Sequence, residues 1–341
     1  MSPKPHRNPG SIMSTGSSSS ADVIRIHKHG GPEEMRFESI DLPPPSAGQV
    51  RLRQTAIGLN FIDVYTRTGL YPGPTPAVLG VEAAGIVEAL GEGVSGLKSG
   101  DRVVYNGLGG AYASHRNAPA DRMIKIPEAV KDEDAAAVFL KGLTVWMLIF
   151  EIRRLNPGET ILVWAAAGGV GSILVPWANA LGARVIGVVS TPEKAELAKA
   201  YGCWETILAS EDVPARVKEL NGGKGVPVVY DSVGKTSAEP SMKSLQPRGW
   251  FITYGNASGP ADPIPPSRLN QGGSLIMTRP GLFHFTHKRE DLERGSAALW
   301  GAMRSGAVRA DVRQRFALKD AAEAHRALES RKTTGATILL P

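Results

Sequence analysis

Apolar and polar positions in the second half of the chain follow two periods in turn, which predicts alternating strands and helices. Short apolar runs, typical of buried strands, fall near residues 160–165, 184–189, 204–207, 226–231, 249–254 and 274–278. Segments with helical spacing fill the gaps near residues 170–181, 192–201, 211–221 and 235–245. This alternation predicts an α/β fold built on a doubly wound parallel sheet.

The first part of the chain has a different pattern. From Val23 to about Ile126, short segments rich in Val, Ile and Gly are separated by turn residues, which predicts a β-rich, partly closed barrel. The spacing becomes helical from Glu133 to Ile152. After Pro280 we expect a helix over Arg289–Ser305, two short strands, a last helix near Lys319–Ser330, and a final strand, Ala336–Leu340, that returns to the first domain.

Bulk composition narrows the class of protein. A chain of 341 residues suits two domains, and no apolar run approaches the roughly 18 residues of a membrane span. Basic residues exceed acidic ones by 39 − 33 = 6, but they are scattered, so a mildly basic surface is favoured over a nucleic-acid site. A pocket for a polyanionic cofactor would account for part of the excess. The single cysteine, Cys203, excludes a disulfide within the chain and fits a cytoplasmic location.

Residues 1–20 are rich in Ser, Pro and Gly and lack an apolar core segment. We expect a disordered N-terminal extension and not a secretory signal. An organellar transit peptide is the weaker alternative, because Lys4 and Arg7 supply too few basic residues.

A glycine-rich turn, Ala165–Ser172, joins the apolar run Thr160–Trp164 to a predicted helix. The dinucleotide fingerprint G-x-G-x-x-G is present as Ala166-x-Gly168-x-x-Gly171, with alanine in the first position. Strand, turn and helix start together form a cradle for a pyrophosphate, because glycines allow close approach and the helix start offers free N–H groups. The alternative is that the turn serves only tight packing between strand and helix and binds no ligand.

The end of the next strand indicates which dinucleotide binds. An acidic residue there would hold the ribose 2′-hydroxyl of NAD, but the strand Arg184–Val189 ends in Ser190-Thr191, with Lys194 close by. A hydroxyl and a cation suit the 2′-phosphate of NADPH. Ser190 or Thr191 can also be a helix N-cap, with Glu193 completing a capping box, and both interpretations can hold.

Several further motifs share a resemblance to one family. They are His27–Pro32, Ile57–Asp63, Gly69–Pro72, Phe139–Thr144, Val229–Gly234 and Leu328–Arg331. In this order they resemble the NADPH:quinone oxidoreductases, the zeta-crystallin-like branch of the medium-chain dehydrogenase/reductase superfamily. The resemblance runs from about Val23 to Pro341. Beyond the N-terminal extension over residues 1–20, it implies a GroES-like catalytic domain over residues 21–143 and 281–341 and a Rossmann NADPH-binding domain over residues 144–280.

Zinc-dependent members of this superfamily provide a test. By resemblance, their zinc ligands would be a cysteine where this chain has Asn60, a histidine where it has Val81, and a third ligand where it has Lys141. The side chains of Asn, Val and Lys cannot replace thiolate and imidazole ligands. The resemblance therefore implies a zinc-independent enzyme. The remaining candidate pair, His284-x-x-His287, is interpreted as surface histidines.

The resemblance also implies the site residues. It places Asn60 and Asp63 near the nicotinamide, and Tyr71 at the mouth of the cleft, so Tyr71, Asn60 and Asp63 are the catalytic candidates. Tyr71 could donate a proton as hydride arrives, or it could be a stacking wall with water as the proton source. The expected cofactor residues are Asn60, Phe61, Tyr65, Thr144, Ala167, Gly168, Gly169, Val170, Ser190, Lys194, Ser232, Tyr254, Gly255, Leu282 and Arg331.

Within this set, Lys194 and Arg331 would hold the 2′-phosphate. The family often adds a tyrosine after the third strand, but this chain reads Ile207-Leu208-Ala209-Ser210 there, so the two cations must contribute more.

The expected reaction is hydride transfer from NADPH to a quinone or a similar conjugated carbonyl. An enoyl-thioester or alkenal reductase is the near alternative. An RNA-binding or crystallin-like protein that retains NADPH is the distant one, and clustered basic and aromatic residues, which RNA binding calls for, are missing. The resemblance implies a homodimer joined through the sheet edge, supplied by Gly273–Thr278 and Trp250–Tyr254.

Overall fold

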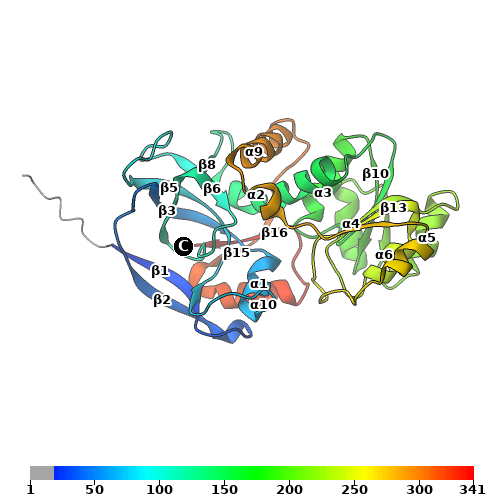
Figure 1. Cartoon of the computed structure of the whole chain (residues 1–341), viewed down its shortest axis with the longest axis horizontal. Coiled ribbons are helices and arrows are strands. Elements are labelled where there is room, and N and C mark those ends of the chain that lie inside the picture. Colours follow the sequence, from blue (N-terminus) through cyan, green and yellow to red (C-terminus); the bar gives the residue numbers. More distant parts are fainter. Residues whose placement is uncertain (1–18) are drawn as a thin grey trace, which may run out of the picture.

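The computed structural model describes residues 19–341 and contains two main sheets with helices around and between them (Figure 1). One sheet is parallel and lies at the right of the view; the other, mostly antiparallel, lies at the left. The predicted α/β class with a doubly wound sheet and a second, β-rich part is confirmed.

The parallel sheet has six strands in the order β11-β10-β9-β12-β13-β14. They are β9 (Thr160–Trp164), β10 (Arg184–Val189), β11 (Glu205–Leu208), β12 (Val226–Asp231), β13 (Leu245–Thr253) and β14 (Ile276–Thr278). The connecting helices are α3 (Gly171–Ala180), α4 (Pro192–Ala200), α5 (Val213–Leu220), α6 (Ala238–Lys243) and α7 (Pro266–Gln271). The order reverses between β9 and β12, and ligands of such sheets bind where strand ends diverge at this point.

The expected sheet edge is corrected in part. β14 is an edge strand, but the segment Trp250–Tyr254 is not, because β13 pairs with β12 on one side and with β14 on the other. Strand order is a tertiary property, and the apolar run alone does not specify it.

The β-rich part, built from residues 19–125 and 312–340, folds as two sheets that are antiparallel except where β15 pairs with β16. The smaller sheet has the order β2-β1-β4, from β1 (Ser19–Ile26), β2 (Met35–Leu42) and β4 (Ala77–Val78). The larger has the order β15-β16-β3-β5-β6-β8 with β7 beside β3. Its strands are β3 (Gln49–Gly58), β5 (Glu82–Leu90), β6 (Arg102–Asn106), β7 (His115–Pro119), β8 (Ile124–Lys125), β15 (Val312–Ala317) and β16 (Ala336–Leu340).

Two details of this part differ from the sequence prediction. One strand, β15, and not two, lies between the late helix and the last one. Ser19 and Ser20 pair with Leu42 and Asp41 in β1, so they belong to the sheet and not to the predicted extension; residues 1–18 of that extension lie outside the described residues. The final strand does return to the first sheet, because β16 pairs with β3.

A long helix joins the two parts. Helix α2 (Asp132–Trp146) continues as wider, π-helical turns over Met147–Ile152. In the described part of the chain this is the one helix long and apolar enough to cross a membrane, which the sequence analysis did not anticipate. Because 78 % of its most apolar window is buried in the protein, it is a core helix.

The other helices and 3-10 turns cover the outside and the junction. They are α1 (Phe61–Thr68), α8 (Leu282–Phe285), α9 (Arg289–Arg304), α10 (Ala321–Glu329), η1 (Pro32–Glu34), η2 (Ala120–Arg122) and η4 (Leu318–Asp320).

A buried polar chain ties α1 to α10. Arg67 is 1 % exposed and donates to both carboxylate oxygens of Glu329 at 2.9 and 2.8 Å. It also donates to His325 Nδ1 at 3.0 Å, and burial and the Arg67 charge lower the pKa of His325 to about 3. The neutral ring keeps a proton on Nε2, which donates to the Tyr112 hydroxyl at 3.0 Å. That hydroxyl donates to Asp63 at 3.1 Å.

We expect Glu329→Ala to reduce the free energy of unfolding by about 3 kcal/mol, because it leaves the buried Arg67 guanidinium without its anion. The matched control is Glu323→Ala in the same helix, whose ion pair with Arg326 is exposed, so its cost should be below about 1 kcal/mol. Urea unfolding measures both. Equal losses would show that the ion pair of Glu329 with the buried Arg67 has no special role.

Candidate active site

A cavity of about 430 Å³ lies at the carboxyl ends of the parallel strands and is also lined by residues of the β-rich part, such as Asn60 and Tyr71. Every residue predicted to bind the cofactor lines it. They are Asn60, Phe61, Tyr65, Thr144, Ala167, Gly168, Gly169, Val170, Ser190, Lys194, Ser232, Tyr254, Gly255, Leu282 and Arg331. Of the three catalytic candidates, Asn60 and Tyr71 also line the cavity, whereas Asp63 does not.

The glycine turn between β9 and α3 is closed by its own backbone. Gly168 N–H donates to the Ala165 carbonyl at 2.8 Å, and Ala165 has φ 53°, in the left-handed region. A Cβ on Gly171 would lie 2.4 Å from the Ala166 carbonyl oxygen, so only glycine fits there. The methyl of Ala166 is accommodated because Gly187 on β10 leaves room, since a Cβ at Gly187 would be 2.8 Å away.

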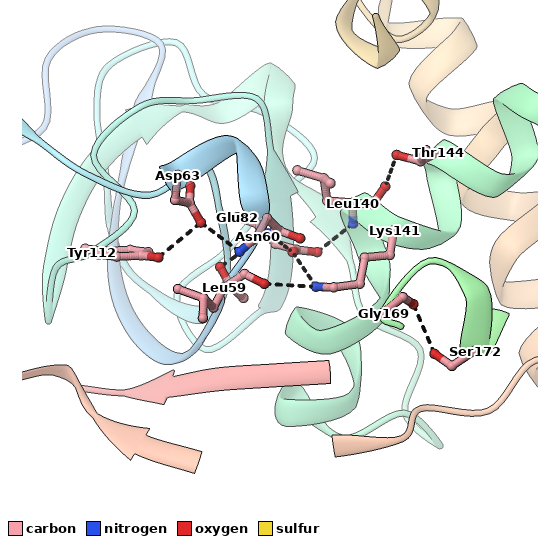
Figure 2. Close-up of polar contacts among 11 residues, drawn as sticks. Leu59, Asn60, Asp63, Glu82, Tyr112, Leu140, Lys141, Thr144, Gly169 and Ser172 are labelled. Atoms are coloured by element: carbon pink, nitrogen blue, oxygen red, sulfur yellow. Dashed lines mark hydrogen bonds and ion pairs between the residues drawn. The ribbon is translucent and has the colours of Figure 1, made fainter. Parts of the chain in front are cut away.

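Figure 2 shows how the turn passes into the helix. The Ser172 hydroxyl donates to the Gly169 carbonyl at 3.0 Å. Gly168 and Gly169 line the cavity beside this helix start, as the fingerprint requires of a pyrophosphate cradle.

Two cations meet at one end of the cavity. Lys194 Nζ donates to the Arg331 carbonyl oxygen at 2.6 Å, and Arg331 Nη2 donates to the Ala257 carbonyl oxygen at 3.1 Å. Neither forms an ion pair within residues 19–341. Burial and the charge of Arg331 lower the pKa of Lys194. Such an arrangement suits an anion.

The N-cap interpretation of this region is confirmed for Thr191, but Glu193 is then the second helical residue and does not complete a capping box. Thr191 is the N-cap of α4 and accepts from Lys194 N–H at 3.3 Å, which leaves the Ser190 side chain exposed in the cavity wall. Ala209, the residue after β11, also lines the wall.

An aromatic pair also lines the cavity. The rings of Tyr65 and Tyr71 lie 5.2 Å apart, and the Tyr65 hydroxyl accepts from Asn256 N–H at 2.8 Å. Tyr71 is 38 % exposed, and its hydroxyl accepts from Arg279 Nη2 at 3.3 Å. Sequence analysis missed Arg279, although its place directly after the last parallel strand was a usable signal.

The deep wall is a cluster of buried polar residues (Figure 2). Asn60 Nδ2 donates to Glu82 Oε2 at 2.8 Å. Glu82 Oε1 accepts from Leu140 N–H at 2.5 Å. Lys141 Nζ lies 3.3 Å from the Leu59 carbonyl oxygen and 3.8 Å from Glu82 Oε2. Glu82 and Lys141 were not among the predicted site residues.

The placement of Asp63 among the catalytic candidates is corrected. Its side chain is fully buried behind the cavity wall and accepts from Asn60 N–H at 2.9 Å, as the capping box of α1. Burial raises the pKa of Asp63 to about 7. Its structural task is to hold the start of α1, and therefore Asn60, in place.

The residues present do not fit a zinc ion. Of the three positions compared with zinc ligands, Asn60 and Lys141 contact Glu82, and Val81 offers no donor. Across residues 19–341 no group of three or more His, Cys, Asp or Glu side chains gathers as a metal site. His284 and His287 are exposed, and His287 Nδ1 lies 2.9 Å from the His284 carbonyl oxygen.

Known proteins were compared with this chain. The family described as "Alcohol dehydrogenase GroES-like domain" matches residues 46–128, and the one described as "Zinc-binding dehydrogenase" matches residues 169–290. A quinone oxidoreductase of Salmonella typhimurium is 47 % identical over 94 % of this chain and 100 % of its own length.

Two further relatives bear on the site. The structure of the Escherichia coli quinone oxidoreductase complexed with NADPH is 46 % identical, with a TM-score of 0.92 over 94 % of this chain and 100 % of that one. A 2-haloacrylate reductase of Burkholderia sp. is 45 % identical over 93 % of this chain and 98 % of its own length.

Proposed function

Since the chain belongs to the quinone oxidoreductase family of the medium-chain dehydrogenase/reductase superfamily, we propose that it is an NADPH-dependent reductase of quinones and related conjugated carbonyls. The observation that carries this is the cavity, because the glycine turn, the cation pair and the tyrosine pair all line it. When bound, NADPH supplies a hydride.

The residues present fit this cofactor. Gly168 and Gly169 lie where a pyrophosphate needs close backbone approach, and Lys194 with Arg331 offers two cations for a 2′-phosphate. Ser232 and Gly255 follow β12 and β13 at the strand ends. A Cβ on Gly255 would lie 2.4 Å from the Ser232 carbonyl oxygen, so the two loops pack against each other there with no room for a side chain at residue 255.

We assign the proton transfer to Tyr71. Its hydroxyl sits at the mouth of the cavity beside Arg279, which donates to it and so leaves the phenol proton free to point elsewhere. The nearby guanidinium would also stabilise the phenolate left after proton donation.

We expect Tyr71→Phe to lower kcat with enones about 100-fold, because water must then supply the proton at carbon or oxygen. With quinones kcat should change little, since hydroquinone oxygens take protons readily from solvent. Stopped-flow oxidation of NADPH with 2-cyclohexen-1-one and with 1,4-benzoquinone measures both. An unchanged kcat with every acceptor would exclude the role.

Zinc independence is part of the proposal. It is supported by Asn60, Val81 and Lys141, whose side chains offer no thiolate or imidazole. The enzyme is expected to keep its activity after dialysis against a chelator.

The function is tested with a panel of quinones, enals and enoyl thioesters, each with NADPH and with NADH. Wild-type enzyme that reduces none of them would refute the proposal. The Burkholderia relative favours one second candidate, reduction of a carbon–carbon double bond conjugated to a carboxyl group, so 2-chloroacrylate belongs in the panel.

We also propose the domain division given above, a cytoplasmic location and a homodimer. The two sheets support the division, since all strands between residues 160 and 278 form one sheet. The single cysteine and the use of NADPH support the location. The edge strand β14, where Ile276 is 40 % exposed, supports pairing with a second copy.

A further inference from the structure

A buried ammonium forms part of the cavity wall. Lys141 on α2 is 6 % exposed, and an ammonium has three N–H donors. The Leu59 carbonyl oxygen accepts one of them at 3.3 Å. Glu82 Oε2, at 3.8 Å, lies beyond hydrogen-bond distance, so donors of Lys141 remain for another acceptor.

Glu82 stabilises this charge without taking up its donors. Its two oxygens accept from Leu140 N–H and from Asn60 Nδ2, at 2.5 and 2.8 Å. Burial raises the pKa of Glu82 and lowers that of Lys141, and each charge opposes the shift of the other. The carboxylate is therefore held in place by Leu140 and Asn60, with the ammonium of Lys141 opposite it (Figure 2). Lys141 lines the cavity, whereas Glu82 does not.

The aliphatic part of Lys141 fixes where the charge lies. A Cβ on Gly169 would be 2.9 Å from Lys141 Cε and 3.2 Å from Cδ, so the stem lies across the glycine turn. Gly169, Asn60 and Thr144 all line the same cavity. The ammonium thus sits between the cofactor cradle and the deep wall.

We propose that Lys141 is a catalytic residue that hydrogen-bonds the carbonyl oxygen of the acceptor and stabilises the negative charge that this oxygen gains. The inference rests on the proposed function. When a conjugated carbonyl accepts a hydride at carbon, the electron pair displaced from its π system moves onto the oxygen. That oxyanion later takes a proton from Tyr71 or from water, and Lys141 keeps its own protons throughout.

This assignment also gives a reason for the lack of fit to zinc. The wall already holds a fixed positive charge of the protein's own, on Lys141, which lines the cavity and lies 3.8 Å from Glu82. A preorganised donor in a site of low dielectric constant stabilises a developing oxyanion strongly.

The test uses the double variant Glu82→Gln/Lys141→Met. It removes both buried charges together, since Lys141→Met alone would leave the buried Glu82 carboxylate unpaired and destabilise the fold. We expect kcat with 1,4-benzoquinone and with 2-cyclohexen-1-one to fall about 100-fold. The dissociation constant of NADPH, measured by its fluorescence, should stay within about 3-fold. Asp101→Asn/Lys125→Met removes an ion pair away from the cavity, with an exposed lysine and no net change in charge, and is the charge-matched control.

A second measurement does not depend on turnover. The oxyanion of 4-nitrophenol absorbs in the visible, and at one pH a larger share of the bound probe should be phenolate in the wild type than in the double variant. Unchanged kcat with both acceptors, or a loss explained wholly by weaker NADPH binding, overturns the proposal, as does an equal phenolate share. Wild-type enzyme without any reductase activity would refute the proposed function instead.

Discussion

A methyl group at residue 171 should abolish binding of both NADPH and NADH. In Gly171→Ala the new Cβ would lie 2.4 Å from the Ala166 carbonyl oxygen and 2.5 Å from that of Ala165. Both atoms are backbone at the tightest point of the turn, so the turn must open. We expect affinity for either dinucleotide to fall by more than about 1,000-fold, because the cradle loses its shape, together with a lower Tm. Fluorescence titration and thermal unfolding measure the two effects.

The chain offers a matched control for this change. Gly301 lies inside α9, and a Cβ there would meet nothing within 4 Å. Gly301→Ala should therefore leave cofactor binding unchanged and stabilise the helix by about 0.5–1 kcal/mol. Normal NADPH affinity in Gly171→Ala would mean that the turn is not the pyrophosphate cradle.

Removing the two cations that line the cavity, Lys194 and Arg331, should cancel the preference for NADPH. Lys194 and Arg331 each offer a charge-assisted hydrogen bond to a 2′-phosphate, of about 2 kcal/mol. The variant Lys194→Ala/Arg331→Ala should therefore bind NADPH about 1,000-fold more weakly. NADH has no 2′-phosphate, so its affinity should change less than about 3-fold.

The measurement is kcat/KM with each cofactor at fixed acceptor, supported by the dissociation constants. Lys199→Ala/Lys332→Ala removes the same net charge from exposed positions nearby, and it separates a specific contact from the general field. An equal loss for NADPH and NADH would contradict the assignment of these residues to the phosphate.

Much of the fold could be predicted from patterns of residues that are close together in the chain. The strand–helix alternation appears in the structure with boundaries shifted by a few residues, and the glycine turn lies where the fingerprint placed it. Each of these features depends on residues that are neighbours in the chain, and periodicity reports such features well.

Asp63 shows where a local pattern misleads. The spacing from Asn60 to Asp63 belongs to the family resemblance, but it is also the spacing of a capping box, and the structure uses the carboxylate for the cap. A sequence cannot decide whether a polar side chain turns into a cavity or back onto its own helix.

The missed contacts all join distant parts of the chain. Tyr71 and Arg279 are 208 residues apart, and Glu82 and Leu140 are 58 apart. No periodicity links such positions, because their meeting depends on how the two sheets pack.

The sequence by itself determined the doubly wound sheet, the cradle and the absence of zinc-type ligands at three positions, because these depend on residue type and short spacing. The tertiary structure alone decided that β13 is interior, that Lys194 meets Arg331, and that Lys141 faces the cavity with Glu82 behind it. Those outcomes depend on strand order and on burial, which set distance and dielectric surroundings, and neither property is local to the chain.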